Sequence, residues 1–381
     1  MALTIEPFRV DVPNDVLHDL RERLSRTRFP NQVEGAGWDQ GTELGYLQEL
    51  VAYWRDGYDW RAHERRLNQL DHFATEIEGQ RIHFVHARSP EPSALPLILS
   101  HGWPGSIVEF LDVIGPLTDP VAHGGDPRDA FHVVAPSLPG YGFSGPTSEP
   151  GWTPRRMATA FARIMRELGY ERYGAQGGDW GSVISANLAE LEPDRVCGLH
   201  LSFVITRVDR DDPLLTDDER RALAAMEEFR RTGAGYQEIQ GTKPQSLGYG
   251  LEDSPAGLAA WIVEKFRAWS DCDGDVERSF TKDQLLTNIA VYWVTHTATS
   301  STRLYYETRR AGPSALPQGR IEVPTGVAVY PGEVTKLPRR WVEHRYNVTH
   351  WKEQPHGGHF AAMEVPDLYV PDVREFFRTV H

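Results

Sequence analysis

The segment YGAQGGDWGSVIS, residues 173–185, constrains the fold of this chain more than any other stretch. Its centre, residues 177–181, has the small-x-nucleophile-x-small spacing of a nucleophile elbow, a tight strand-to-helix turn that lifts one side chain into an active site. Glycines are needed on both sides of the central residue because a Cβ there would collide with the neighbouring strand and helix. The following SVISANLAELEPDRV carries small and apolar residues on one face and predicts a helix that ends before Pro193.

The central residue of this motif is Asp179, where an esterase or lipase would have serine. An aspartate side chain is ionised at neutral pH without the help of a base. It can attack an sp3 carbon and leave an ester that water later cleaves, whereas serine would leave an ether. The residue therefore indicates alkyl transfer from an epoxide or a halide. The alternative is a turn in which the aspartate only caps the next helix.

Composition and charge set the broad class of the protein. Of its 381 residues, 40% are hydrophobic and 25% charged, which is ordinary for a globular α/β protein. The net charge of −14 argues against nucleic acid or an anionic membrane surface as a partner. Only Cys197 and Cys272 are present, so we expect no disulfide framework and no metal site of the CxxC type. The sequence lacks a signal peptide and an apolar run of the ~20 residues of a membrane span, which predicts a soluble cytoplasmic protein.

Strand and helix patterns divide the chain into four parts. Residues 1–72 are predicted to form a helical meander packed on the core. Residues 73–204 alternate strands with helices, which predicts a largely parallel sheet covered on both faces. Residues 205–318 have the pattern of helices and loops, and residues 319–381 complete the core. The predicted fold is α/β, with a helical insertion that covers the edge of the sheet where the elbow opens, as a lid.

Local patterns predict individual elements of the first two parts. Leucines at helical spacing follow Asn14 and Asp15, either of which can cap that helix. The segments FATEIEG and QRIHFVHARS predict an antiparallel hairpin that turns at residues 78–79. The segment SIVEFLDVIGPL, residues 106–117, is predicted to form one helix between two strands.

The second half of the chain also carries helix signals. Thr216 with Glu219, and Thr281 with Gln284, have the spacing of a capping box at a helix start. The segment VPTGVAVYPGE predicts a strand, and residues 370–380 predict the closing helix.

The acid and the histidine of a hydrolase can be sought downstream of the elbow. The chain order Asp179, Glu333, His359 matches the α/β-hydrolase arrangement of nucleophile, acid and base. Because Asp179 is already charged, the histidine would activate water against the ester, and Glu333 would fix its tautomer. The spacing leaves His356 open as an alternative histidine. The alternative acids are Glu343, Glu353 and Glu364.

Two further groups are needed for the chemistry. The turn His101-Gly102-Trp103-Pro104 follows a predicted strand, and proline would fix it in a cis or otherwise rigid form. The backbone N–H groups of Trp103 and Trp180 would then form an oxyanion hole. We read His101 itself as a residue that ties the loop.

Opening an epoxide also leaves an alkoxide, which a tyrosine phenol with a pKa of about 10 can protonate. The predicted lid offers several phenols between which composition does not choose: Tyr236, Tyr249, Tyr292, Tyr305 and Tyr306.

The motifs HGWPGS, GGDWGS, GYQEIQGTKPQSLGYGL, SSTRLYYE and GGHFAAMEVP occur in this order along the chain. Together they resemble the epoxide hydrolase family, in the branch that has the microsomal-type N-terminal region. Residues 5–30 and 34–90 resemble the helical meander of that region, so the resemblance spans nearly the whole chain. Microsomal relatives carry a membrane anchor before the meander, whereas this chain starts at the meander, which favours a soluble enzyme without an anchor.

The resemblance implies a role for each matching residue. It implies that Asp179 is the nucleophile, His359 the base that activates water, and Glu333 the charge-relay acid. Tyr236 in the GYxxIQ motif and Tyr305 in RLYYE match the two oxirane-binding tyrosines. The adjacent tyrosine leaves that second match ambiguous by one residue. Trp103 and Trp180 would supply the oxyanion-hole amides.

We therefore expect an enzyme that converts a small lipophilic epoxide and water to a vicinal diol without a cofactor. The nearest alternative is a haloalkane or haloacid dehalogenase, which shares the aspartate elbow but needs halide-binding N–H donors in its lid. A hydrolase-fold binding protein without activity is a third possibility, against which the intact nucleophile, acid and base argue. The sequence does not specify the natural substrate, the stereoselectivity or whether the chain forms a homo-oligomer.

Overall fold

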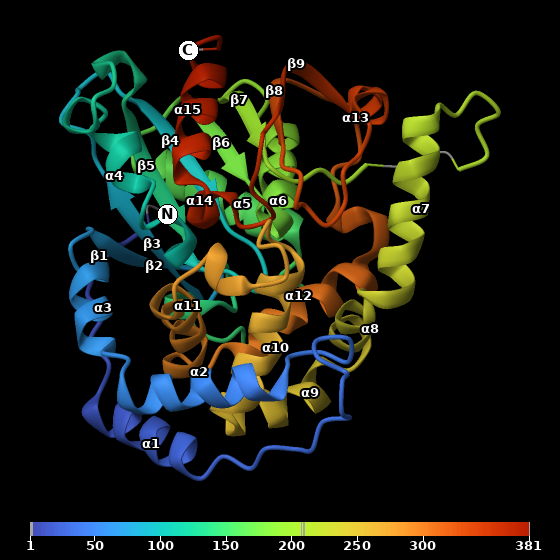
Figure 1. The fold of residues 1–381 in the computed structure, drawn as a ribbon. Helices are drawn as coiled ribbons and strands as arrows, with labels where there is room; N and C mark the ends of the chain where they lie inside the picture. Colours follow the sequence, from blue (N-terminus) through green and yellow to red (C-terminus); the bar gives the residue numbers. More distant parts are fainter. Residues whose placement is uncertain (1–2, 207, 209, 381) are drawn as a thin grey trace.

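The computed structural model describes residues 3–206, 208 and 210–380. Within them the core is a nine-stranded sheet with the order β1-β2-β3-β5-β4-β6-β7-β8-β9 (Figure 1). The strands are β1 (Ile5–Phe8), β2 (His72–Ile77), β3 (Gln80–Ala87), β4 (Leu95–Ser100), β5 (Phe131–Pro136), β6 (Tyr173–Gly177), β7 (Val196–Leu201), β8 (Ile321–Val329) and β9 (Tyr346–Glu353). The pairs from β5 across to β9 are parallel, whereas β1, β2, β3 and β5 pair antiparallel.

The predicted hairpin is confirmed, and one part of the meander prediction is wrong. Strands β2 and β3 turn at Glu78 and Gly79, whose φ angles of 52° and 74° suit the twist of a two-residue hairpin. Residues 1–72 were expected to be helical, but β1 lies within them and pairs with β2 at the edge of the sheet. Pro7 hides this strand in the sequence, since proline is tolerated mainly in edge strands.

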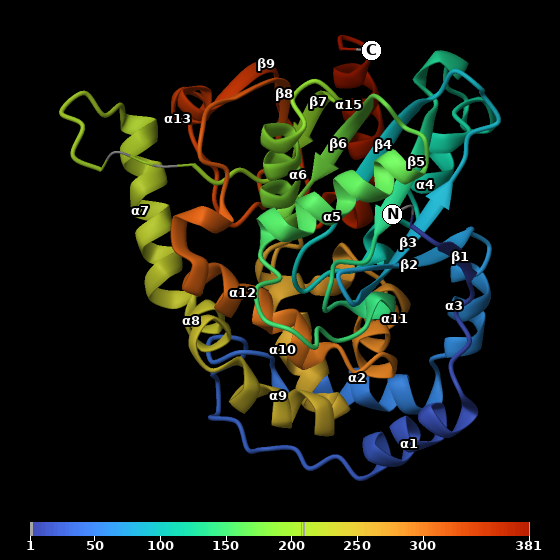
Figure 2. The same cartoon turned by 180° about the vertical axis from the view of Figure 1, so that it is seen from behind.

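Helices cover both faces of the sheet, as the alternating pattern predicts. Helices α5 (Pro154–Glu167) and α6 (Asp179–Leu191) lie on one face, which Figure 2 shows in front. Helices α4 (Ile114–Thr118), α14 (Ala361–Glu364) and α15 (Pro366–Phe377) lie on the other, which faces the viewer in Figure 1. The core therefore has three layers, helix, sheet and helix.

Two helix predictions on the second face are corrected by the structure. Residues 106–117 do not form one helix but a 3-10 turn, η1 (Ile107–Phe110), followed by α4. Pro116 explains the break. It has no N–H to donate to the carbonyl of residue 112, so it is tolerated only in the first turn of a helix, and α4 begins two residues before it. The closing helix begins at Pro366, a position that favours proline, and not at residue 370; it ends at Phe377.

Among the described residues, six α-helices lie between β7 and β8. They are α7 (Asp217–Thr232), α8 (Gly235–Thr242), α9 (Pro244–Asp253), α10 (Pro255–Ala268), α11 (Lys282–Val294) and α12 (Ala298–Ala311). Both predicted capping boxes are present, Thr216 with Glu219 before α7 and Thr281 with Gln284 before α11. Figure 1 shows α8 to α12 below the sheet, while α7 stands at the side of the molecule.

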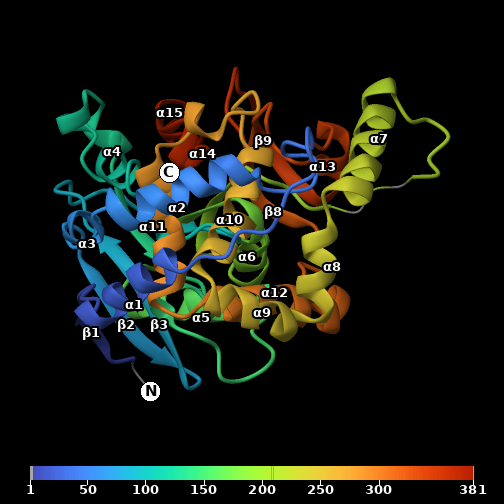
Figure 3. The same ribbon diagram turned by 60° about the horizontal axis from the view of Figure 1, so that its bottom comes forward.

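The N-terminal helices pack on this insertion. They are α1 (Asn14–Ser25), α2 (Leu44–Asp56) and α3 (Trp60–Leu67), and Figure 3 shows α2 crossing α10 and α11. Contrary to the prediction, neither Asn14 nor Asp15 caps α1, because the N-cap is Pro13 and the Asn14 amide oxygen accepts a hydrogen bond from Arg61 at 2.5 Å. How the chain divides into domains stays a prediction.

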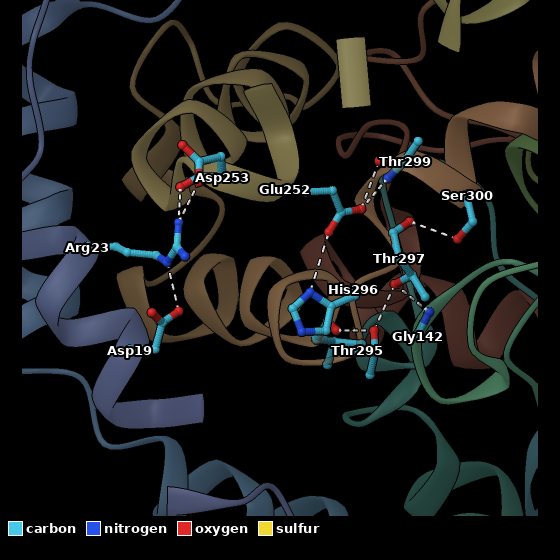
Figure 4. A network of polar contacts seen from close by, with 11 residues as sticks. Asp19, Arg23, Gly142, Glu252, Asp253, Thr295, His296, Thr297, Thr299 and Ser300 are labelled. Atoms are coloured by element: carbon cyan, nitrogen blue, oxygen red, sulfur yellow. Dashed lines mark hydrogen bonds and ion pairs between the residues drawn. The ribbon is translucent and has the colours of Figure 1, made fainter. Parts of the chain in front are cut away.

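Polar contacts fix the start of α12, the helix that carries the RLYYE motif (Figure 4). The carboxylate of Glu252 accepts hydrogen bonds from the backbone N–H and the hydroxyl of Thr299, at 2.8 and 2.9 Å. The buried hydroxyl of Thr297 accepts the N–H of Gly142 at 3.0 Å, which ties α12 to the loop after β5. Buried hydrogen bonds of this kind hold the helix in a fixed position over the end of the sheet.

Candidate active site

The turn between β6 and α6 has the geometry that its glycine motif predicts. Asp179, the first residue of α6, has a φ of 46°, a left-handed conformation that is uncommon outside glycine. A Cβ on Gly177 would lie 2.3 Å from the backbone of Gly181, and a Cβ on Gly181 would lie 1.8 Å from the carbonyl oxygen of Ser100. Because no side chain fits at either position, the turn can be this sharp only with glycine.

The Asp179 carboxylate is held by a backbone N–H and does not cap its own helix. The Trp103 N–H donates a hydrogen bond to Oδ1 at 2.7 Å, and α6 has no side-chain cap. The Trp103–Pro104 peptide bond is cis, one of the two forms expected for this turn. Gly102 leaves room for the carboxylate, since a Cβ there would lie 2.2 Å from Oδ1. Trp180 follows as the second residue of α6, whose first N–H groups have no acceptor within the helix.

Two buried side chains from the second half of the core reach the Asp179 carboxylate. The Nε2 atom of His359 lies 3.5 Å from Oδ2, and its Nδ1 lies 2.7 Å from Oε1 of Glu333. Glu333 stands four residues beyond β8 and also accepts the N–H of Val334 at 2.6 Å. The backbone N–H of His359 donates to the carbonyl of Trp269 at 2.8 Å, which fixes the loop. Asp179, Glu333 and His359 are thus brought into one chain of contacts.

The charge state of His359 depends on these carboxylates. Burial opposes the charged form of the imidazole, but Glu333 and Asp179 outweigh it and hold the pKa of His359 well above its usual value. In the free protein the imidazole therefore holds its proton more tightly than an ordinary histidine does. It can accept a proton readily only after the negative charge on Asp179 is lost.

None of the alternative acids and histidines lies at this place. His356 and Glu353 are exposed, and Glu343 pairs with Arg339. Glu364 accepts the backbone N–H of Gly358 at 2.8 Å, so it supports the loop before His359 without touching the ring. His101 ties its loop as predicted, because its Nε2 accepts the N–H of Leu138 at 3.2 Å.

Two phenols from the inserted helices stand beside Asp179. Tyr236 of α8 stacks on the Trp103 indole, with ring centroids 5.1 Å apart, and Tyr305 of α12 meets the Trp180 ring edge-on at 4.9 Å. The two tyrosine rings are 5.8 Å apart and nearly perpendicular. Burial raises the pKa of each phenol, and the negative Asp179 acts in the same direction. Both phenols are therefore neutral hydrogen-bond donors at neutral pH.

The other candidate tyrosines lie elsewhere, and of the two tyrosines in RLYYE it is Tyr305 that lines the cavity next to Asp179. Tyr306 is half-buried and does not line the cavity next to Asp179. Tyr249 is 72% exposed. The Tyr292 hydroxyl donates to the carbonyl of Gly105 at 2.5 Å and is therefore occupied.

A cavity of about 250 Å³ connects these groups. Its lining is mostly apolar and aromatic: Asp179, Trp180, Phe203, Ile205, Phe229, Tyr236, Gln237, Trp269, Tyr305, Val334, Thr335 and His359. A small apolar molecule that enters it would lie between the two phenols and the carboxylate.

Comparisons with known proteins agree with this geometry. Two family models match, the epoxide hydrolase N terminus over residues 5–110 and the alpha/beta hydrolase fold over residues 96–239. A protein of Stigmatella aurantiaca (strain DW4/3-1), named as a proposed epoxide hydrolase, is 47% identical over 98% of this chain and 85% of its own length. Epoxide hydrolase 1 of Sus scrofa is 39% identical over 98% of this chain and 88% of its own length. The chain belongs to the epoxide hydrolase family.

Solved structures of epoxide hydrolases have the same fold. The juvenile hormone epoxide hydrolase of the silkworm Bombyx mori superposes with a TM-score of 0.91 at 32% identity, covering 99% of this chain and 95% of that one. The Aspergillus niger epoxide hydrolase superposes with a TM-score of 0.88 at 31% identity, covering 100% of this chain and 97% of that one. The predicted α/β-hydrolase fold is confirmed, and the chain is a hydrolase. The comparisons give no support to the dehalogenase alternative.

Two absences concern only the residues that the structure describes. None of their helices is long and apolar enough to cross a membrane. They also contain no group of three or more His, Cys, Asp or Glu side chains that could hold a metal ion.

Several residues around the site of this epoxide hydrolase were not predicted from the sequence. Phe203 and Ile205 line the cavity and lie two and four residues beyond the end of β7. Their position after the carboxyl end of a parallel strand could have identified them, because ligands bind at that edge of such sheets. Lys265 is 5% exposed, and its Nζ lies over the Tyr236 ring, 4.7 Å from the centroid. Glu109 lines a second cavity next to Asp179. Neither charged residue carries a motif that would have identified it.

Proposed function

We propose that this protein hydrolyses an epoxide to a vicinal diol through a covalent ester on Asp179. The single observation that carries the proposal is the placement of the Tyr236 and Tyr305 rings, the Asp179 carboxylate and His359 around one apolar cavity. Paired phenols suit an oxirane oxygen, which needs a donor when the ring opens. Epoxide hydrolase names on relatives that match nearly the whole chain support the same reaction.

The first step would be alkylation of Asp179. Tyr236 and Tyr305 donate hydrogen bonds to the oxirane oxygen while Oδ2 of Asp179 attacks a ring carbon, because Oδ1 is held by the Trp103 N–H. The carbon–oxygen bond of the ring breaks, and the oxygen takes a proton from one phenol. The product is a hydroxyalkyl ester and a phenolate.

The second step would be hydrolysis of that ester. Alkylation removes the charge of Asp179, which is one cause of the high pKa of His359, so the imidazole can pass its proton to the phenolate. This transfer restores the phenol and leaves a neutral imidazole that can accept a proton from water. The hydroxide attacks the ester carbon, and the N–H groups of Trp103 and Trp180 stabilise the oxyanion. When the ester cleaves, His359 gives its proton to the alkyl oxygen and the diol is released. The proton left on the Asp179 carboxyl group then passes to His359, which restores the starting state.

The inserted helices would act as a lid over this chemistry. Helices α8 and α12 carry the two phenols, and residues of α7, α8 and α12 line the cavity together with Trp269, which follows α10, and with the core. An apolar lining favours a lipophilic epoxide and keeps bulk water from the ester. We therefore assign the insertion, residues 205–318, the role of a substrate-binding lid.

The test is intact-protein mass spectrometry of the His359→Gln variant after incubation with styrene oxide, and separately with a haloalkane. With its base removed the enzyme should stall at the ester. A gain equal to the whole epoxide mass, mapped to Asp179, is the expected result, and Asp179→Asn supplies the control without an adduct. An adduct from the haloalkane alone would make the protein a dehalogenase. No adduct from either probe would overturn the covalent mechanism.

A further inference from the structure

A second, smaller cavity also adjoins Asp179 and His359 and is separate from the larger cavity beside the phenols. Its volume is about 20 Å³. A space of about 10–15 Å³ on this measure is enough for one water molecule, provided that polar groups face it. The cavity therefore has the size for a single bound water next to the nucleophile and the histidine.

Several residues that line this cavity carry buried polar side-chain atoms without a hydrogen-bond partner. Ser100, Gln176 and Tyr369 are each 1% exposed and His359 is 7% exposed, and all four line it. Among the described residues no hydrogen-bond partner exists for Oγ of Ser100, Oε1 of Gln176 or the Tyr369 hydroxyl, and Nε2 of His359 has only the 3.5 Å ion pair with Asp179. A buried polar atom without a partner costs about 1–3 kcal/mol, so three such atoms on residues around one cavity indicate that a polar ligand binds there.

Glu109 supplies a carboxyl group to the same cavity. It belongs to η1, and its side chain turns back against the loop after β4, where a Cβ on Gly105 would lie 1.5 Å from its Oε1. The missing side chain of Gly105 is therefore what gives the Glu109 carboxyl its place. Glu109 lines the cavity together with Asp179 and His359, and it interacts electrostatically with both.

We propose that this cavity holds the water that hydrolyses the Asp179 ester, and that Glu109 is the positioning residue that orients it. One hydrogen of the water is donated to Nε2 of His359 and the other to the Glu109 carboxylate, which turns a lone pair of the oxygen toward Cγ of Asp179. As the new bond to Cγ forms, His359 takes the first proton. The bond between Cγ and the alkyl oxygen then breaks, that oxygen takes a proton from His359, and the oxygen of the water stays on Asp179.

The charges around Glu109 fit this order of events. Burial raises the pKa of Glu109 to about 8, the negative Asp179 acts in the same direction, and His359 opposes both. Of the two charges, His359 has the larger effect. The imidazolium that forms as His359 takes the proton of the water therefore favours the carboxylate form of Glu109 during the attack on the ester.

The experiment follows a single turnover of styrene oxide by the Glu109→Gln variant, with rapid quenching and intact-protein mass spectrometry. This substitution keeps the size of the side chain but removes the carboxylate. We expect the ester to form at the wild-type rate and to decay at least about tenfold more slowly, so that it accumulates. A residue that is merely structural would slow both steps. Decay at the wild-type rate would overturn the inference.

A matched pair of tyrosines tests the cavity independently of Glu109. The hydroxyls of Tyr369 and Tyr330 are both buried without a partner among the described residues, but only Tyr369 lines the cavity. Tyr369→Phe should slow ester decay and Tyr330→Phe should not; equal effects would overturn the water site. The inference rests on the proposed function. A failure of the proposed function can be told apart from a failure of the water site, because the ester would then be absent even from His359→Gln.

Discussion

At the scale of single residues, the charge of Asp179 controls its neighbours. It helps to raise the pKa of His359 in the free enzyme, so a neutral side chain at position 179 should lower that pKa. Asp179→Asn keeps the shape and removes the charge, and NMR titration of the imidazole would show the lower midpoint. Glu353→Gln, at an exposed position, is the control and should leave the midpoint unchanged. An unaltered His359 titration in Asp179→Asn would contradict the coupling between the two steps.

Lys265 leads to a second residue-scale prediction. Its ammonium group lies over the Tyr236 ring and stabilises the negative charge that develops on the phenol as it gives its proton to the opening oxirane. Lys265→Met should slow ester formation by roughly two- to thirtyfold, the range of about 0.5–2 kcal/mol for such contacts. Lys265→Arg should restore most of the rate, because it keeps the cation. Stopped-flow tryptophan fluorescence measures this step, and ester decay should be unaffected.

At the scale of elements, the elbow makes the sharpest prediction. Gly181→Ala would place a Cβ 1.8 Å from the Ser100 carbonyl oxygen, and neither backbone can yield without disturbing the sheet. Overpacking of this kind costs about 1–3 kcal/mol, and a clash between backbones belongs at the upper end. Gly250→Ala, in the exposed part of α9 with nothing within 4 Å, should instead stabilise by about 0.5–1 kcal/mol. Urea unfolding compares the two; a stable Gly181→Ala variant would contradict the packing argument.

Elements with strong local signals could be predicted from the sequence, and those with weak ones could not. The elbow, the hairpin and both capping boxes depend on residues a few positions apart, so their patterns are complete within one window. Strand β9 has no regular alternation of buried and exposed residues, because it lies at the edge of the sheet and neither face is well covered. Its pairing with β8 is a tertiary effect that no local pattern encodes.

The same distinction holds for the site. Asp179, Glu333 and His359 could be found because their order along the chain is set by the fold, and the motif positions match those of the family. Glu109 and Lys265 could not, since charged residues in amphipathic segments are normally on the surface. Only the folded chain shows that Gly105 makes room for one carboxyl and that three aromatic rings surround the ammonium group.

At the scale of the whole molecule, the buried carboxyl of Glu109 links the site to stability. Its pKa is about 8 in the folded chain against a usual value of 4.5, so the folded state binds the proton more tightly than the unfolded state. That stabilisation is complete below about pH 4.5 and is lost as the pH rises to 8, with a slope of up to about 1.4 kcal/mol per pH unit. The glutamine of Glu109→Gln does not titrate, so the free energy of unfolding of that variant does not fall for this reason as the pH rises.

The free energy of unfolding of the wild type should therefore fall relative to that of Glu109→Gln between pH 5 and pH 8, the window set by these pKa values. Urea unfolding of both proteins across this range measures the difference. Parallel curves would mean that Glu109 ionises as readily in the folded chain as in the unfolded one, which its enclosed position beside Asp179 argues against. Because unfolding needs no substrate, the result tests the environment of Glu109 separately from its proposed part in hydrolysis.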